Sequence, residues 1–323
     1  MLTPSIWSID AAFAFGLGAV IAAVVVPLTI AAQQRAALGQ QIYEDGPRSH
    51  GVKQGTPTMG GLAFIAAVLT AAAAKSSLAE VPLAGLTLAA GCIGLVDDLL
   101  IVRKRRALGL RARTKSALLL VAALAYVAIV SRTQPAHATQ AWFGHAVTMP
   151  QWLWFLLAVV AINATAHAVN ITDGLDGLAA GSVAAPLAVL AYASHDALAI
   201  AVLGACLGFL WFNRHPARIF MGDTGSLALG ALLAGCAIQA NMLLVLPMLG
   251  LVFVIEALSV IAQVASFKTT GKRILKMSPL HHHFELSGWP EQRVTHAIVA
   301  ASFMAAAITW IGLLLTNARG SAS

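Results

Sequence analysis

The sequence is poor in charged side chains, with 10% Asp, Glu, Lys and Arg against 59% hydrophobic residues in a chain of 323. Soluble domains usually carry about 25% charged residues, so this composition excludes an ordinary water-soluble domain. Cysteine is also scarce, and the three that occur lie inside apolar runs without the spacing of metal ligands: Cys92, Cys206 and Cys236. This pattern favours packing over a disulfide framework or a zinc site.

In place of charge the chain has repeated apolar runs of about 20 residues, the length that a helix needs to cross a bilayer. The first run, from Ala11 to Ala32, has no basic segment before it, so we interpret it as a retained span and not as a cleaved signal peptide. The expected spans have centres near Val20, Ala66, Leu88, Ala123, Val159, Ala185, Gly204, Leu232, Val254 and Thr309. The sequence therefore predicts an all-α polytopic membrane protein with ten transmembrane helices, forming one integral membrane domain over residues 1–323.

The basic residues lie almost entirely on one side of these spans. Of the 20 Lys and Arg residues, all but Lys75, Arg132 and Arg319 fall in the loops after the first, third, seventh and ninth spans. Loops rich in Lys and Arg stay in the cytoplasm, so both termini are expected outside. Loop orientation also accounts for the net charge of +7, and no nucleic-acid partner is expected.

The acidic residues gather on the same side, beginning with a carboxylate pair. Asp97 and Asp98 close the third span, and such a pair at a membrane boundary is costly unless it is solvated, paired or bound to a metal. The alternative is a pair at the water interface that balances the cations after it.

A third acid, Asp223, lies in the polar stretch from Asn213 to Ser226 between two apolar runs, framed by Gly222 and Gly225. Glycines let a backbone approach a ligand closely, and an Asp in such a turn is a reasonable ligand for Mg²⁺. The alternative is an ordinary turn in which Asp223 or Thr224 caps the next helix.

Two further acids, Asp173 and Asp176, lie in the turn Asn170–Gly177 after the fifth span. On one helical turn they would share a face, and in a loop they could still converge. Capping of the sixth span is the alternative, although two acids, an Asn and a Thr exceed what capping requires.

The last cytoplasmic loop contains three consecutive histidines, His281, His282 and His283. Three adjacent side chains do not easily converge on one tetrahedral ion, so zinc is not expected, and contacts with an anionic substrate are more plausible. Glu256 stands alone within the ninth span and needs a partner, and Pro247 marks the entry of that span or a kink in it. On the opposite side, Gln140–Met149 is expected to form a small hairpin.

Acids, cations, an Asn-containing and Gly-containing turn and histidines thus gather at one membrane face. This is what chemistry on the phosphate of a membrane-bound substrate requires. Mg²⁺ neutralises charge on the leaving group, Lys and Arg hold the remaining phosphates, and a carboxylate activates the nucleophile.

These segments resemble the phospho-N-acetylmuramoyl-pentapeptide transferases, within the superfamily of polyprenyl-phosphate sugar-1-phosphate transferases. The matching segments are Gly46–His50, Gly55–Gly61, Val96–Asp98, Asn170–Gly177, Phe220–Ser226 and His281–Glu291. They run in the family's order through nearly the whole chain. The aspartate segments are shared with the superfamily, whereas His281–Glu291 is specific to the family.

The resemblance implies transfer of a phospho-sugar from UDP-N-acetylmuramoyl-pentapeptide to undecaprenyl phosphate, with release of UMP and formation of the first lipid-linked peptidoglycan precursor. It implies Mg²⁺ as cofactor, and it leaves direct attack and a covalent intermediate both open. It also implies ten helices in the bacterial inner membrane, an active site facing the cytoplasm, a homodimer, and a bent ninth span beside a groove for the prenyl chain.

Carried over by position, the resemblance makes Asp97, Asp98 and Asp223 the essential acids, with Asp223 the Mg²⁺ ligand and Asp97 the group that activates the lipid phosphate. The residues implied at the nucleoside end are Asn170, Asp173, Gly174, Leu175, Asp176 and Phe220, the last by stacking on uracil. Those implied at the diphosphate and sugar are Lys53, Lys115, Asn213, His281, His282 and His283.

The chain departs from the family pattern after the aspartate pair, where Leu99 and Ile101 replace an aromatic residue and a lysine. Arg103 or Lys104 would have to make the phosphate contact instead. The nearest rival is a sibling transferase that uses UDP-N-acetylglucosamine, against which His281–Glu291 argues. A rival from another class is an ion-coupled transporter, which usually has its acids near the midplane of the membrane; here only Glu256 is expected there. A membrane scaffold without catalysis would leave the clustered acids unexplained.

Overall fold

The computed structural model describes residues 9–36, 53–74, 80–104, 109–133, 138–194 and 196–320. The matching segment Gly46–His50, together with the basic residues Arg48, Lys75, Arg105 and Arg106, lies outside these ranges.

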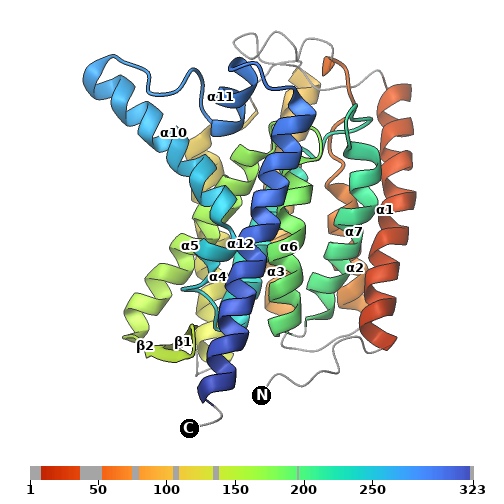
Figure 1. Ribbon diagram of the computed structural model, residues 1–323. Coiled ribbons are helices and arrows are strands. Elements are labelled where there is room, and N and C mark those ends of the chain that lie inside the picture. Colours follow the sequence, from red (N-terminus) through yellow and green to blue (C-terminus); the bar gives the residue numbers. More distant parts are fainter. Residues whose placement is uncertain are drawn as a thin grey trace.

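The described chain is predominantly helical (Figure 1). Its helices are α1 (Ile9–Arg35), α2 (Leu62–Ala74), α3 (Val81–Lys104), α4 (Ala112–Thr133), α5 (Gln151–Thr172), α6 (Leu178–Ser194), α7 (Ala197–Asn213), α8 (Gly222–Gln239), α9 (Leu246–Leu249), α10 (Leu251–Thr270), α11 (Leu280–Leu286) and α12 (Glu291–Gly320). The centre of each expected span falls inside one of the longer helices.

Six helices are long and apolar enough to cross a membrane by length and composition: α1, α3, α4, α5, α10 and α12. The shorter apolar helices α2, α6 and α7 accompany them. The chain is therefore a multi-pass membrane protein, as the sequence predicts. That all ten expected spans cross the bilayer, with both termini outside, stays a prediction.

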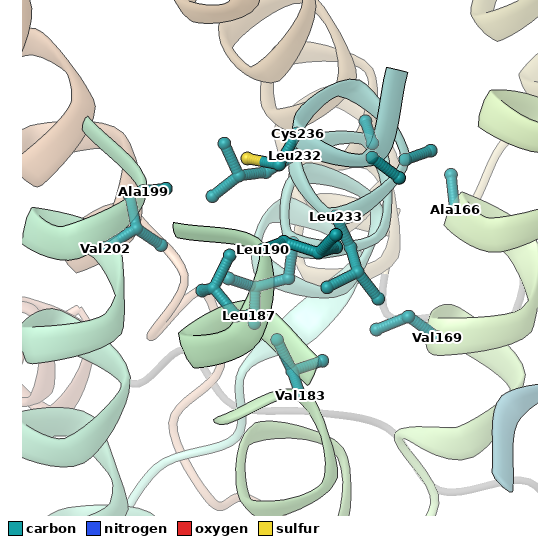
Figure 2. Packing of buried hydrophobic residues seen from close by; sticks show 14 of the residues in the cluster. Ala166, Val169, Val183, Leu187, Leu190, Ala199, Val202, Leu232, Leu233 and Cys236 are labelled. Atoms are coloured by element: carbon teal, nitrogen blue, oxygen red, sulfur yellow. The ribbon is translucent and has the colours of Figure 1, made fainter. Parts of the chain in front are cut away.

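Helix α8 forms the centre of the bundle, because its sequence is apolar all round and such a helix is buried on every side. Figure 2 shows Leu233 of α8 facing Leu187 of α6 and Val169 of α5, and Leu232 on the side of α8 toward Val202 of α7. Nearly every residue of α8 after its first turn is inaccessible to solvent. The start of this helix, which carries Asp223, is consequently held in a fixed place.

The ninth expected span is broken as Pro247 suggests. Pro247 lies in the short helix α9, and Gly250 separates α9 from α10. The expected hairpin is also present, as antiparallel strands β1 (Thr139–Trp142) and β2 (His145–Thr148). In Figure 1 this hairpin lies at the opposite end of the bundle from α11.

Candidate active site

The aspartate pair of α3 meets the start of α8. Gly94, Asp97 and Asp98 lie three and four residues apart and thus on one helical face. A Cβ on Gly94 would stand 2.1 Å from the carbonyl oxygen of Asp223, so only glycine permits this approach. The two helices therefore bring acids that are far apart in sequence to one point.

Asp98 is buried and holds the first turn of α8. One of its carboxylate oxygens accepts a hydrogen bond from the backbone N–H of Asp223 (3.0 Å), and the other accepts from the N–H (2.9 Å) and the hydroxyl (2.6 Å) of Thr224. A carboxylate is favoured at this place, where the N–H groups of a helix have no partner within the helix. The alternative, in which Asp223 or Thr224 caps the helix, is not what the structure shows, because the side chain that binds these N–H groups comes from α3.

Asp97 and Asp223 share the ammonium group of Lys115, which lies in the first turn of α4. Lys115 Nζ lies 2.6 Å from Asp223 Oδ2 and 3.3 Å from Asp97 Oδ2. Asn170 donates to Asp223 Oδ1 (2.7 Å) and to the Ser226 hydroxyl (2.9 Å). The structure thus gathers four of the predicted residues around Asp223.

The residues of this cluster fit a divalent cation. Asp97, Asp98 and Asp223 each offer a carboxylate oxygen, and these atoms all lie within 4.8 Å of one another. An all-oxygen set is what Mg²⁺ prefers. Because both oxygens of Asp98 accept hydrogen bonds from α8, Asp97 and Asp223 are the two with oxygens facing the position that Lys115 now occupies.

A second cluster forms around Asp176, so the acids do not all converge on one point. Lys53 Nζ lies 2.8 Å from Asp176 Oδ1 and 2.5 Å from Glu291 Oε1, and His215 Nδ1 lies 2.9 Å from Asp176 Oδ2. Glu291 also accepts from the N–H of Asp176 (2.9 Å). These contacts join the turn Asn170–Gly177 to the start of α12.

Asn213 and Phe220 line the same region. Asn213 accepts a hydrogen bond from the N–H of Gly177 (3.0 Å) and donates to the carbonyl of Ile219 (2.9 Å). Lys53 Nζ stands 6.0 Å from the centre of the Phe220 ring, and the N–H of Phe220 binds the carbonyl of Pro57 (2.8 Å). The segment after Lys53 is thereby tied to the loop before α8.

The histidine segment reaches the site through one of its three members. His281 is fully buried, and its Nδ1 lies 3.2 Å from Glu256 Oε2, which supplies the partner that Glu256 requires. Its Nε2 lies against Gly174, where a Cβ would come within 2.3 Å. His282 and His283 instead contact their own segment, at Glu285 (2.7 Å) and at the N–H of Lys276 (3.2 Å).

Asp173 and Leu175 complete the turn. Leu175 is buried with Leu178 and Val294. Burial, together with the negative charges of Asp223, Asp98 and Asp176, raises the pKa of Asp173 to about 8. Asp173 is consequently mostly protonated at neutral pH.

Three participants were missing from the residues predicted for the site: His215, Glu291 and His167. His215 lies in the polar stretch from Asn213 to Ser226, and Glu291 lies in the segment His281–Glu291, but the sequence predicts no role for either residue. His167 lies on α5, where its Nε2 is 2.9 Å from the hydroxyl of Ser116, next to Lys115. An ionisable residue inside an apolar span often has a functional role. By this criterion His167 could have been predicted as a site residue.

An apolar cavity of about 410 Å³ lies between α5 and the broken pair α9 and α10. Its walls include Leu157, Ala164, Leu246, Pro247 and Phe253. The break at Pro247 therefore lies beside a groove, as the resemblance implies.

The fold and the site together define a multi-pass α-helical membrane protein that has a carboxylate cluster fit for a divalent cation where its helices end. Comparison with known proteins then gives the family. Residues 81–241 match the model of glycosyl transferase family 4, and residues 53–65 match signature 1 of the phospho-N-acetylmuramoyl-pentapeptide-transferases.

Full-length relatives agree with these matches. The phospho-N-acetylmuramoyl-pentapeptide-transferase of Heliobacterium modesticaldum is 45% identical over 96% of this chain and 97% of its own length. Those of Moorella thermoacetica and Bacillus subtilis are 46% and 41% identical, over 86% and 92% of this chain and 91% and 95% of their own lengths. The chain belongs to the phospho-N-acetylmuramoyl-pentapeptide-transferase family.

Proposed function

We propose that this protein transfers phospho-N-acetylmuramoyl-pentapeptide from its UDP donor to undecaprenyl phosphate, releasing UMP and forming the first lipid-linked peptidoglycan precursor. The observation that carries the proposal is membership in the family, with 45% identity to a relative of that name across nearly the full chain. According to this proposal, the chain is a glycosyl-1-phosphate transferase that consists of one domain over residues 1–323.

The cluster at the start of α8 is the proposed reaction centre. Asp223 and Asp97 would hold Mg²⁺, which neutralises charge on the diphosphate when it is bound. Asp97 is also the group proposed to activate the lipid phosphate, and Lys115 would bind phosphate oxygens once the donor and the ion separate it from the acids. Asp98 supports them by fixing α8.

The cluster around Asp176 is the proposed nucleoside end. Lys53, Asp176 and Asn213 already form hydrogen bonds there, and the Phe220 ring offers a face on which uracil would stack. Asn170 and Asp173 lie between this end and the reaction centre, and Gly174 and Leu175 shape the turn. His281, with His282 and His283 behind it, would face the sugar and diphosphate.

The lipid substrate would lie along the apolar cavity beside α9 and α10. Its lining is almost wholly aliphatic and aromatic, which suits a prenyl chain. Undecaprenyl phosphate held there would place its phosphate toward the end of α3 and the start of α8.

The proposed location is the bacterial cytoplasmic membrane, with ten spans, both termini outside and the site facing the cytoplasm. The Lys and Arg distribution supports this orientation, and the resemblance supports a homodimer. Both acid clusters lie on the same loops and helix ends that carry most of the Lys and Arg residues.

The test supplies purified protein with undecaprenyl phosphate and either radiolabelled UDP-N-acetylmuramoyl-pentapeptide or UDP-N-acetylglucosamine, with and without a chelator. We expect chelator-sensitive transfer from the first donor only. Transfer only from the second would make the protein the sibling transferase. Absence of transfer from both, together with ion-coupled uptake in vesicles, would make it a transporter.

A further inference from the structure

An open cavity of about 520 Å³ lies at the end of α7, beside the cluster around Asp176. It is lined by Trp211, Arg214, His215, Pro216 and Arg218. The proposed reaction uses neither arginine.

Both guanidinium groups are held in place by aromatic rings. Arg214 Cζ lies 4.1 Å from the centre of the Trp211 ring, and Arg218 Cζ lies 4.6 Å from that of Phe212. Arg218 also donates to the carbonyl oxygen of Trp211 (3.2 Å). Such stacking orders an arginine without neutralising it.

Carboxylates do not balance these two charges within the part of the chain that the structure describes. Neither Arg214 nor Arg218 forms an ion pair there, whereas the nearby acids Asp176 and Glu291 are bound by Lys53 and His215. Two fixed, exposed cations beside a cavity favour an anion with several oxygens.

The surface below the arginines is apolar. Leu207 and Trp211 lie four residues apart, on one face of α7, and are 45% and 60% exposed. Helix α7 stands at the edge of the bundle beside α1 (Figure 1). Tryptophan at the end of an apolar helix marks the level of lipid headgroups.

We propose that Arg214 and Arg218 bind the phosphate of an anionic phospholipid, whose acyl chain lies along Trp211 and Leu207. Two cations next to an exposed apolar stripe match an amphiphile that has an anionic headgroup and an apolar tail. A free phosphate ion would need only the two cations and would make no use of the apolar stripe. The cavity shares His215 with the cluster around Asp176, so a bound lipid headgroup would lie beside the proposed donor site.

The test measures quenching of tryptophan fluorescence in nanodiscs that contain brominated phosphatidylglycerol or brominated phosphatidylcholine. The difference between the wild type and Trp211→Phe isolates the signal of Trp211. We expect the wild type to prefer phosphatidylglycerol. In Arg214→Gln/Arg218→Gln this preference should fall by roughly 25-fold in relative affinity, since each of the two basic residues near an anionic surface adds about fivefold.

The matched control is Lys272→Gln/Arg273→Gln, which removes the same charge beyond the end of α10 and should retain the preference. If the double variant fails to fold, the single variant Arg214→Gln takes its place. Within the described chain the Arg214 side chain forms no hydrogen bond that this change would remove. The single variant should lose part of the preference. Equal quenching by both lipids in the wild type would overturn the proposal. So would loss of the preference on adding inorganic phosphate or UMP, which would assign the arginines to a soluble anion.

Discussion

Asp98 on α3 accepts two hydrogen bonds from one residue of α8, the backbone N–H and the hydroxyl of Thr224, at 2.9 and 2.6 Å. The neighbouring N–H of Asp223 adds a third. This contact fixes the metal-ligand candidate Asp223 relative to Asp97, the residue before Asp98. The resemblance makes all three aspartates essential, and these hydrogen bonds suggest that Asp98 contributes by positioning Asp223.

Replacing Asp98 should therefore affect folding as well as turnover. Asp98→Ala removes the acceptor of the buried N–H and hydroxyl of Thr224 and of the partly buried N–H of Asp223, and we expect a loss of about 1–3 kcal/mol in the free energy of unfolding. Thermal unfolding in detergent measures it. Thr224→Val removes only the hydroxyl bond and should give a smaller decrease, and an unchanged melting temperature for Asp98→Ala would contradict the positioning role.

Asp223 should behave in the opposite way. Asp223→Asn keeps the shape of the side chain but weakens its metal and lysine contacts, so we expect turnover to fall by roughly 100-fold or more with little change in melting temperature. Transfer assays across a range of Mg²⁺ concentrations measure this. Asp10→Asn, a similar change at the start of α1, is the control; full activity in Asp223→Asn would mean that the metal assignment is wrong.

Lys115 and a cation should compete for the same oxygens. Lys115→Met removes the ammonium between Asp97 and Asp223, so the protein without donor should bind Mn²⁺, a stand-in for Mg²⁺, roughly tenfold more tightly, in line with about 1.5 kcal/mol for a charged hydrogen bond. Turnover should fall, since the phosphate contact is lost. Electron paramagnetic resonance of Mn²⁺ measures binding independently of activity. Weaker Mn²⁺ binding in the variant would contradict the prediction that Lys115 and the cation compete for the same oxygens.

The stability of the protein should decrease with rising pH because of Asp173. Its pKa is about 8 in the fold and about 3.9 in an unfolded chain, so between these values the folded state holds a proton that the unfolded state lacks. The free energy of unfolding then falls as pH rises through this window, by at most about 1.4 kcal/mol per pH unit. Asp173→Asn should flatten the dependence measured by denaturant unfolding at several pH values; a parallel slope in the variant would argue against it.

Gly174 should tolerate no side chain, because a Cβ there would meet Nε2 of the buried His281. Gly174→Ala must displace His281 or the turn, and we expect a rise in KM for the donor and a loss of roughly 1–3 kcal/mol in stability. Gly85→Ala on α3 is the matched control, since a Cβ there meets no atom within 4 Å, and it should be neutral or stabilising. Similar kinetics for the two variants would show that His281 does not act through this contact.

Much of the site could be found from the sequence, because each segment carries a local signal. The apolar runs predict the helices, and Pro247 predicts the break between α9 and α10. Asp97, Asp223 and Asn170 were singled out from polar residues at the ends of apolar runs, and the structure brings them together with Lys115. The assignment of roles within this group stays a prediction.

The pairing of these residues could not be predicted, because sequence spacing does not determine which distant groups meet. Asp98 and Thr224 are 126 residues apart, and Glu256 finds its partner in His281 only because the segment after α10 folds back. The sequence predicts that the acids gather at one membrane face, but it does not show that Asp176 pairs with Lys53, His215 and Glu291 in a second cluster.

The sequence by itself determined that this protein resides in a membrane, that its basic residues gather in one set of loops and to which family it belongs. These properties follow from hydrophobic length, loop charge and motif order, which are local. Only the tertiary structure decided that Asp98 holds α8, that the acids form two clusters and that Arg214 and Arg218 face an open cavity. Those arrangements depend on how helices pack, and a close approach such as that of Gly94 to Asp223 exists only after the bundle has formed.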